Sequence, residues 1–208
     1  KVARRRYRVY AASTSRLHVE LIWSTLGDPD PSDEGAHPPD GSSTDLFTSA
    51  GTDLDLHLAP RGVGTWSDGD GDGAPDPWLT DDDCYWYNPA PGSDFETSPT
   101  LDRDDTDGWG PENINLDVPS PGVCYDIAVH YWDDWGYGES IPEVRVYFAD
   151  GLAARASATL VQEDLWRVGT VCPDARTFTA AERCAPEGCA PWIVHAYDNA
   201  IEHDAPSN

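Results

Sequence analysis

The sequence contains no methionine, a single lysine and no hydrophobic run long enough to span a bilayer. A membrane-spanning helix needs about 18 consecutive apolar residues. Thirteen basic side chains stand against 38 acidic ones, which leaves a net charge of −25. Nucleic-acid phosphates and anionic lipid surfaces are bound by basic patches, so we expect neither a nucleic-acid partner nor membrane insertion.

Short catalytic patterns are also absent. There is no nucleophile elbow, phosphate-binding loop, dinucleotide fingerprint or HExxH pattern. Carboxylate pairs are no guide to catalysis here, because 38 acidic residues form such pairs by chance. His57 and His130 could lie on adjacent strands, but zinc needs three or four ligands, so hydrogen-bonded sheet histidines are favoured over zinc ligands. We therefore expect a protein that is not an enzyme.

Aliphatic residues are scarce. Leu, Ile, Val and Phe make up only 36 of the 208 residues, which at this net charge is typical of disordered chains. Nine Trp and nine Tyr supply apolar area that this count omits. The local strand patterns are strong as well. We therefore expect a folded protein whose many acids are neutralised, most simply by bound cations.

Alternation of apolar and polar side chains predicts an all-β protein. In 53–58, for example, Leu54, Leu56 and Leu58 are expected to point inward, with Asp53, Asp55 and His57 outward. Helical periodicity is nearly absent, except around 180–184. The predicted strands are 17–23, 53–58, 84–87, 114–118, 123–132, 144–149, 152–161 and 165–171. Seven or eight short strands with long Asp/Gly/Pro-rich loops indicate an antiparallel β-sandwich.

Three regions are expected along the chain: a basic N-terminal arm (1–16), a β-sandwich domain (17–171) and a Cys-containing C-terminal extension (172–208). Five of the first eight residues are basic, in contrast to the acidic remainder. Arg4, Arg6 and Arg8 alternate with Arg5, Tyr7 and Val9, and this period of two is typical of an extended strand. It is either a frayed tail or a strand added to a sheet edge, of the same chain or of a neighbour.

The five cysteines form no CxxC pattern. They predict two disulfides and one spare thiol in an oxidising, extracellular or cell-surface environment. Cys84 and Cys124 lie in strand-like segments and are expected to pair. Two of Cys172, Cys184 and Cys189 are expected to pair with each other.

The sharpest motif, D-x-D-x-D-G-x-x-D, spans residues 68–76. Calcium takes six to eight oxygen ligands in a flexible cage, and Gly73 permits the sharp turn that such a cage needs. The EF-hand's glutamate at the twelfth position is replaced by Leu79, so the loop resembles those of thrombospondin type 3 repeats and dockerin-like modules. A solvated acidic loop is the alternative. The predicted ligands are Asp68, Asp70, Asp72, the Ala74 carbonyl and Asp76.

A second acidic cluster lies in 101–113 and fits no single cage motif. Together with Asp53 and Asp55, its carboxylates could form a second calcium site between loops. Alternatively, Asp102 or Asp107 simply caps a turn. The candidate ligands in this cluster are Asp102, Asp104, Asp105, Asp107 and Glu112.

Aromatic residues gather at Trp132, Trp135 and Tyr137, in a loop punctuated by glycine. Exposed rings of this kind can stack on sugars or contact partner proteins. Packing at the rim of the sandwich is the favoured alternative.

A family resemblance rests on six segments: LHVELIW, TDLDLHL, DCYWYNP, LDRDDTDGWGPENINLD, VCYDIAVHYW and VRVYFADG. This series, within 17–171, is similar to the YfaP-like family of secreted bacterial proteins. The resemblance implies a β-sandwich accessory domain, often attached to larger secreted or surface proteins, with no established catalytic residues. The basic arm and the cysteine-containing tail depart from the family pattern, so a specialised role would reside there.

Three functions follow as hypotheses. The leading one is a secreted, calcium-binding β-sandwich module with a structural or adhesive role at the cell surface. The second is a subunit of an extracellular filament that assembles by strand addition through the N-terminal arm. The third is a carbohydrate-binding accessory domain. The expected partners are accordingly calcium ions and a second copy of the chain, an extracellular protein or a glycan.

Overall fold

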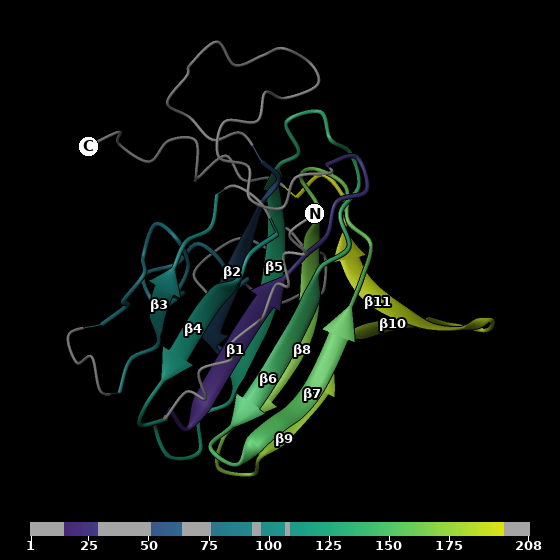
Figure 1. The fold of residues 1–208 in the computed structure, drawn as a ribbon. Coiled ribbons are helices and arrows are strands. Elements are labelled where there is room, and N and C mark those ends of the chain that lie inside the picture. Colours follow the sequence, from purple (N-terminus) through teal and green to yellow (C-terminus); the bar gives the residue numbers. More distant parts are fainter. Residues whose placement is uncertain (1–14, 29–50, 64–75, 93–96, 107–108, 198–208) are drawn as a thin grey trace, which may run out of the picture.

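The computed structural model describes residues 15–28, 51–63, 76–92, 97–106 and 109–197. Within them, eleven strands form two antiparallel sheets that pack face to face (Figure 1). The strands are β1 (Leu17–Ile22), β2 (Asp53–Pro60), β3 (Thr100–Arg103), β4 (Glu112–Leu116), β5 (Tyr125–Asp133), β6 (Glu143–Phe148), β7 (Gly151–Ser157), β8 (Leu165–Cys172), β9 (Thr177–Ala180), β10 (Glu182–Ala185) and β11 (Gly188–Val194). The predicted antiparallel β-sandwich is confirmed, with more strands than the seven or eight expected. None of the described residues belongs to a helix that could cross a membrane.

One sheet has five strands in the order β3-β4-β1-β6-β7. The other has six in the order β10-β11-β8-β5-β2, with β9 paired to β8 outside this path. Because β9 and β11 both pair with β8, the described part of the C-terminal extension continues the second sheet. In the described part of each sheet, β3 and β7 form the edges of the first, and β2 forms one edge of the second.

Four strands lie where no strand was expected. β3 falls in a segment expected to be loop, and β9, β10 and β11 fall in the C-terminal extension. The weak helical signal around 180–184 is wrong, because Ala180 ends β9 and Glu182 begins β10. Conversely, Cys84 forms only an isolated bridge to Leu58 and begins no strand.

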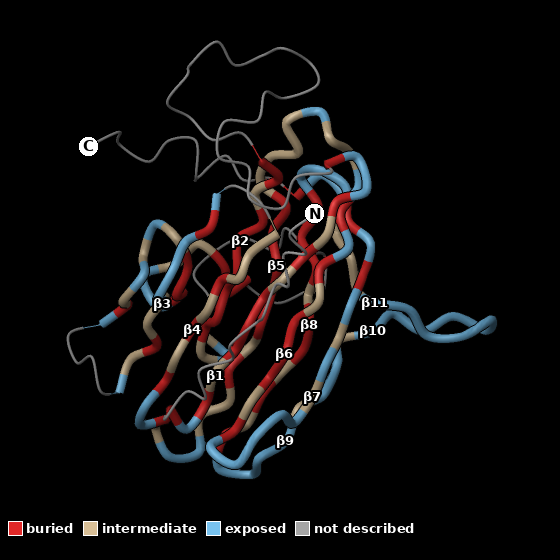
Figure 2. The backbone as a smooth tube through the Cα atoms, viewed as in Figure 1, coloured by how far each residue is buried: buried red, intermediate tan, exposed pale blue. Residues whose placement is uncertain are grey.

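The core lies between the sheets and contains the predicted inward faces (Figure 2). The leucines of β2 and the alternate residues of β1 and β5 are all buried. These residues are Leu17, Val19, Leu21, Leu54, Leu56, Leu58, Tyr125, Ile127, Val129 and Tyr131. The period-two pattern therefore assigned the correct face to each of the three strands.

The outer face of the six-stranded sheet is also covered in part. Asp55 and His57 were expected to face outward, yet both are buried. A second apolar cluster lies on this face, where Trp78 and Tyr197 pack against residues of β2, β5 and β8. Two layers of packing thus enclose β2, which alternation within a single strand does not reveal.

The disulfide pairing differs from the expected one. Cys124 pairs with Cys172 and Cys184 with Cys189, so the predicted Cys84–Cys124 bridge is wrong. Cys124 precedes β5 and Cys172 ends β8, and these two strands are neighbours in one sheet. The free cysteine is Cys84, whose backbone pairs with Leu58 of β2. The predictions of two bridges, one free thiol and a bridge within the last three cysteines are confirmed.

Cys84 is fully buried, and this burial raises the pKa of its thiol far above the usual range. A protonated, inaccessible thiol reacts poorly with alkylating reagents. We expect no alkylation of the unreduced native protein and one alkylated cysteine after denaturation, measured by intact mass. Modification of the native protein would contradict the burial of Cys84, and more than one modified cysteine would contradict the two disulfides.

Candidate metal centre

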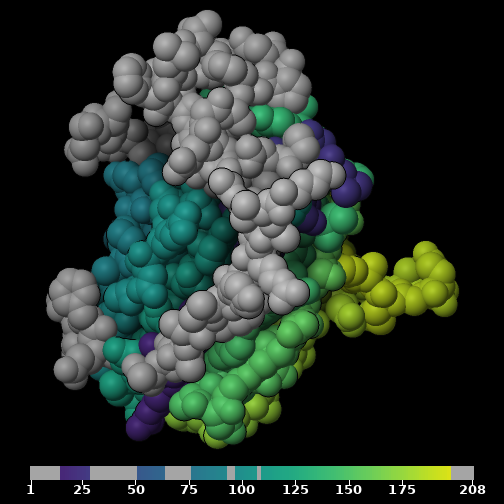
Figure 3. Space-filling model, in the orientation of Figure 1, coloured from purple at the N-terminus to yellow at the C-terminus, as the bar shows by residue number. Residues whose placement is uncertain are grey.

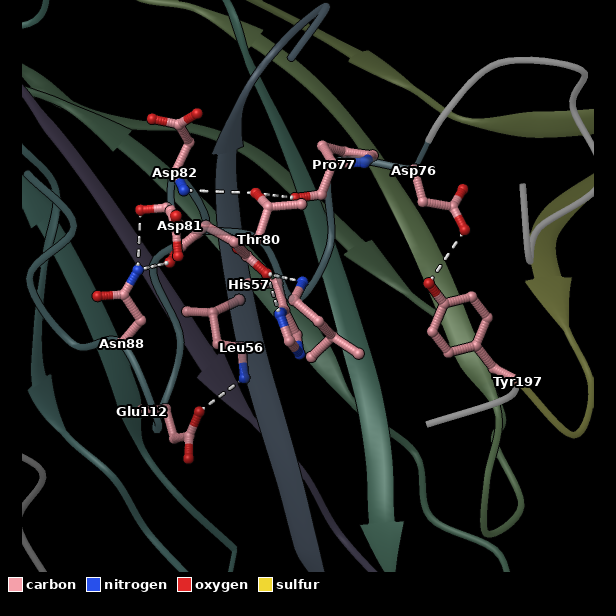
Figure 4. Close-up of polar contacts among 12 residues, drawn as sticks. Leu56, His57, Asp76, Pro77, Thr80, Asp81, Asp82, Asn88, Glu112 and Tyr197 are labelled. Atoms are coloured by element: carbon pink, nitrogen blue, oxygen red, sulfur yellow. Dashed lines mark hydrogen bonds and ion pairs between the residues drawn. The ribbon is translucent and has the colours of Figure 1, made fainter. Parts of the chain in front are cut away.

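The candidate site lies at the edge of the sandwich where β2 faces β4 of the opposite sheet. β2 is an edge strand, so alternate backbone groups point away from β5. The Leu56 amide donates to Glu112 Oε2 at 2.7 Å (Figure 4). Glu112 is the first residue of β4, and its other oxygen, Oε1, accepts from the Asp105 amide at 3.2 Å. One carboxylate therefore joins the two sheets and the segment that follows β3.

Two further carboxylates meet Glu112 at this point. Asp55 projects from β2, and Asp104 follows β3 directly. One ligand oxygen from each of the three residues lies within 4.8 Å of the others. Asp55 is 3% exposed and Glu112 1%, whereas Asp104 is exposed. The cluster thus has two buried carboxylates and one at the surface, which leaves it open to solvent on one side.

The electrostatics of the cluster oppose three negative charges in the absence of a cation. Burial raises the pKa of Glu112 well above its usual range, and the charges of Asp53 and Asp104 raise it further. Hydrogen bonds from the Leu56 and Asp105 amides act in the opposite direction. Burial also raises the pKa of Asp104, although a hydrogen bond with Glu112 lowers it. A divalent cation would remove the repulsion between these groups.

The other predicted ligands of this cluster have different positions. Asp102 accepts a hydrogen bond from Asn115, and Asp105 forms an ion pair with Arg103 at 2.9 Å. Asp53 is half-buried at the start of β2 and close enough to raise the pKa of Glu112. Asp107 lies outside the described residues. The structure therefore brings together three of the predicted residues, from two strands and the segment after a third.

Of the loop formed by residues 68–76, the structure describes Asp76 alone. Asp76 is buried, and its Oδ2 accepts a hydrogen bond from the Tyr197 hydroxyl at 3.0 Å (Figure 4). Asp68, Asp70, Asp72 and Ala74 are not described, so calcium binding by this loop stays a prediction.

His57 lies in a hydrogen-bonded environment. Its Nδ1 is 2.7 Å from Asp83 Oδ2, which also accepts from the Leu79 amide at 2.9 Å. The ring stacks on Tyr85 with centroids 5.0 Å apart. His130 lies opposite Asp55 in the β2–β5 register. His57 therefore has the carboxylate partner typical of a structural sheet histidine.

The aromatic loop after β5 is held by its own acids. Asp133 Oδ1 accepts from the Trp135 amide, and Asp134 accepts from the amides of Gly136 and Gly138. Trp135 itself is half-buried. These contacts fit the alternative of rim packing, and a glycan-binding role for the loop stays a prediction.

Two features of the site had no signal in the sequence. The bond between Glu112 and the Leu56 amide depends on which strands face each other at the sandwich edge, and the pairing of Tyr197 with Asp76 joins residues 121 positions apart. The proximity of Asp55 to the 101–113 cluster was predicted without its geometry. No family model, curated protein or solved structure matches the chain.

Proposed function

We propose that this protein is a secreted calcium-binding β-sandwich module with a structural role at the cell surface. The observation that carries the proposal is the convergence of Asp55, Asp104 and Glu112, whose ligand oxygens lie within 4.8 Å of one another. Such a module would be an accessory domain of the YfaP-like kind. The proposal concerns a binding protein, not an enzyme.

Calcium is the cation that best suits this cluster. All three ligands are carboxylates, and hard oxygen donors select Ca²⁺ or Mg²⁺ over softer metals. Mg²⁺ demands near-ideal octahedral geometry, whereas Ca²⁺ accepts irregular arrangements with six to eight ligands. Because the exposed side of Asp104 faces solvent, water can complete the coordination. The net charge of −25 further favours uptake of cations.

The structural role follows from where the ligands come from. Asp55 belongs to the six-stranded sheet, whereas Glu112 belongs to the five-stranded one. A bound ion would join the two sheets at an edge where the Glu112 carboxylate already bonds to the Leu56 amide. The two disulfides support an oxidising environment, of which the extracellular space is one. Calcium is abundant outside cells, so such a site would be filled there.

Calorimetric titration with Ca²⁺ and thermal melting test the proposal. Calcium at about 100 times its dissociation constant stabilises a protein by about 2.7 kcal/mol. For a domain of this size that corresponds to a rise of about 5–10 °C in Tm. If calcium neither binds nor changes the melting temperature of the chelated protein, the proposal fails.

The Asp68–Asp76 loop is a separate candidate for the same ion. If this loop binds calcium, replacing Asp70 and Asp72 by alanine should lower the calcium stoichiometry in the calorimetric titration by one ion per chain. The same variant should keep the binding at Asp55, Asp104 and Glu112. Full retention of the wild-type stoichiometry would rule out the loop as a calcium site.

A second candidate function is a filament subunit, and the open edge of β7 favours it. Among the strands that the structure describes, β6 is the one partner of β7 in the first sheet, and most residues of β7 are exposed. An unprotected edge strand can accept an extended segment from another chain. Because donor and acceptor would differ, such a contact is heterologous and need not close into a ring.

The N-terminal arm is the donor in this second candidate, and its deletion tests the idea. Removing residues 1–14 of the arm, which keeps Ser15 and its hydrogen bond to Asp117, should abolish concentration-dependent association in light scattering while circular dichroism and Tm stay unchanged. A full-length protein that is monomeric at every concentration would exclude the filament. Unfolding of the truncated chain would instead indicate that the arm pairs within its own molecule.

A further inference from the structure

The β10–β11 hairpin projects from the sandwich into solvent (Figure 3). Only the last residues of β11, Trp192–Val194, pair with β8. Beyond them, Glu182–Ala185 pair with Gly188–Pro191, and all residues of these two segments are exposed. The Cys184–Cys189 disulfide lies near its tip.

The two faces of the hairpin carry different chemistry. Cys184 and Cys189 are directly opposite in the register, and Glu182 precedes Cys184 by two residues. Side chains two apart on a strand share a face, so these three groups point the same way. Arg183 points to the other face, where its guanidinium lies 4.6 Å from the centre of the Trp192 ring. The cation is thereby kept away from the sulfur-bearing face.

One ligand atom each of Glu182, Cys184 and Cys189 lies within 4.8 Å of the others, and all three residues are exposed. We propose that the tip of the hairpin is a redox-gated metal site, closed as a disulfide and able to bind a soft divalent cation such as Zn²⁺ after reduction. The site is distinct from the calcium cluster and does not depend on the proposed calcium function.

The gating step is a two-electron reduction by a dithiol. One thiolate of the dithiol attacks a hairpin sulfur, which breaks the Cys184–Cys189 bond and forms a mixed disulfide. The second thiol of the reductant then displaces the remaining hairpin sulfur. The products are two hairpin thiols and the cyclic disulfide of the reductant, so the electrons and both protons are accounted for. Attack requires access to a sulfur, which the exposed hairpin provides and the half-buried Cys124–Cys172 pair restricts.

The reduced hairpin keeps its ligands together. Arg183 pairs with Ala190 and Ala185 with Gly188, so backbone pairs flank the cysteine pair on both sides. The two sulfurs therefore stay opposite each other when the covalent bond is broken. Thiolates are soft ligands that favour Zn²⁺ over Ca²⁺, and zinc accepts a carboxylate oxygen as a third ligand and water as a fourth. Binding would release the thiol protons.

The test uses the full-length protein, reduced with dithiothreitol and then separated from it without oxygen. Alkylation and intact mass should show two accessible thiols with Cys124–Cys172 intact. In excess Ca²⁺, added to compete with Zn²⁺ for surface carboxylates, Zn²⁺ should bind the reduced protein with one equivalent per chain. Co²⁺ in place of Zn²⁺ should produce thiolate-to-metal absorption. The oxidised protein should give neither result.

Three variants complete the experiment. Cys184→Ser with Cys189→Ser should lose the zinc equivalent and the cobalt absorption. Glu182→Gln should weaken zinc binding by at least about tenfold, because loss of a group that merely orients a ligand already costs about that much. Glu187→Gln, in the hairpin turn, is the matched control and should bind like wild type. Equal zinc binding by the reduced wild type and the double serine variant would overturn the proposal, as would a hairpin disulfide that resists reduction in the folded protein.

Discussion

Replacing Asp104 by asparagine is expected to have opposite effects with and without calcium. In a calcium-saturated protein it should remove most of the ion's stabilisation, about 2.7 kcal/mol at 100 times the dissociation constant. In the presence of a chelator it should instead raise Tm. Asp104 is exposed, so the substitution leaves the core intact and folding is not at risk.

The sign of the effect in chelator follows from the electrostatics of Glu112. The charge of Asp104 is one of the causes that raise the pKa of Glu112, and asparagine removes that charge. The new amide can also donate to the Glu112 carboxylate. Both changes lower the free-energy cost of burying the ionised Glu112 carboxylate, so the folded protein without calcium gains stability.

The pH dependence provides a second check of the same argument. Because the pKa of Glu112 is raised in the folded protein, the native state holds its proton more tightly than the unfolded chain does. The resulting stability is fully present below the usual glutamate pKa of about 4.5 and is lost as pH rises through the raised value. In chelator, the advantage of Asp104→Asn over wild type should therefore grow as pH increases from 4.5.

Asp82→Asn is the matched control for Asp104→Asn. Asp82 is exposed, far from the cluster in sequence, and the substitution removes the same charge. A general relief of the repulsion among the protein's many acids would appear equally in both variants. If Asp104→Asn and Asp82→Asn keep the same calcium-dependent shift in Tm, the cluster is not a calcium site.

The sheet faces were predictable because burial of one face of a strand places apolar residues at every second position of its sequence. Leu54, Leu56 and Leu58 alternate with polar residues, and each is fully buried. Asp55 and His57 were assigned to solvent on the same basis, but Trp78 and its neighbours cover that face. A covering segment that is distant in sequence does not change the apolar–polar alternation of the strand that it covers. The sequence of that strand alone therefore cannot reveal the covering.

The candidate site was predictable in composition and not in geometry. The acids of 101–113 and of β2 were expected to approach each other, and Asp55, Asp104 and Glu112 do so. Which acids converge depends on the bonds each one makes elsewhere. Arg103 forms an ion pair with Asp105 two residues away, and Asn115 donates to Asp102 across the β3–β4 pair, so the second partner follows from strand register. The choice of ligands is thus a property of the assembled sheets.

Register also decides the disulfides, and their unequal roles give the second large effect. Replacing both Cys124 and Cys172 by serine is expected to destabilise the protein by about 4 kcal/mol, because the bridge closes a segment of 48 residues in the unfolded chain. That segment contains β6 and β7 of the opposite sheet, so the bridge restricts an unfolded chain that must assemble both layers. Urea denaturation followed by tryptophan fluorescence measures the loss.

The matched control is the hairpin bridge. Cys184 and Cys189 are only five residues apart, for which the same chain-entropy argument gives about 2 kcal/mol. We expect a loss smaller than this value, because all four residues of β10 are exposed and bury little surface when the protein folds. The double serine variant at 184 and 189 should therefore unfold close to wild type, well above the variant at 124 and 172. Equal losses for the two variants would contradict the argument, since they would require the projecting hairpin to be as tightly coupled to global unfolding as the β5–β8 pair.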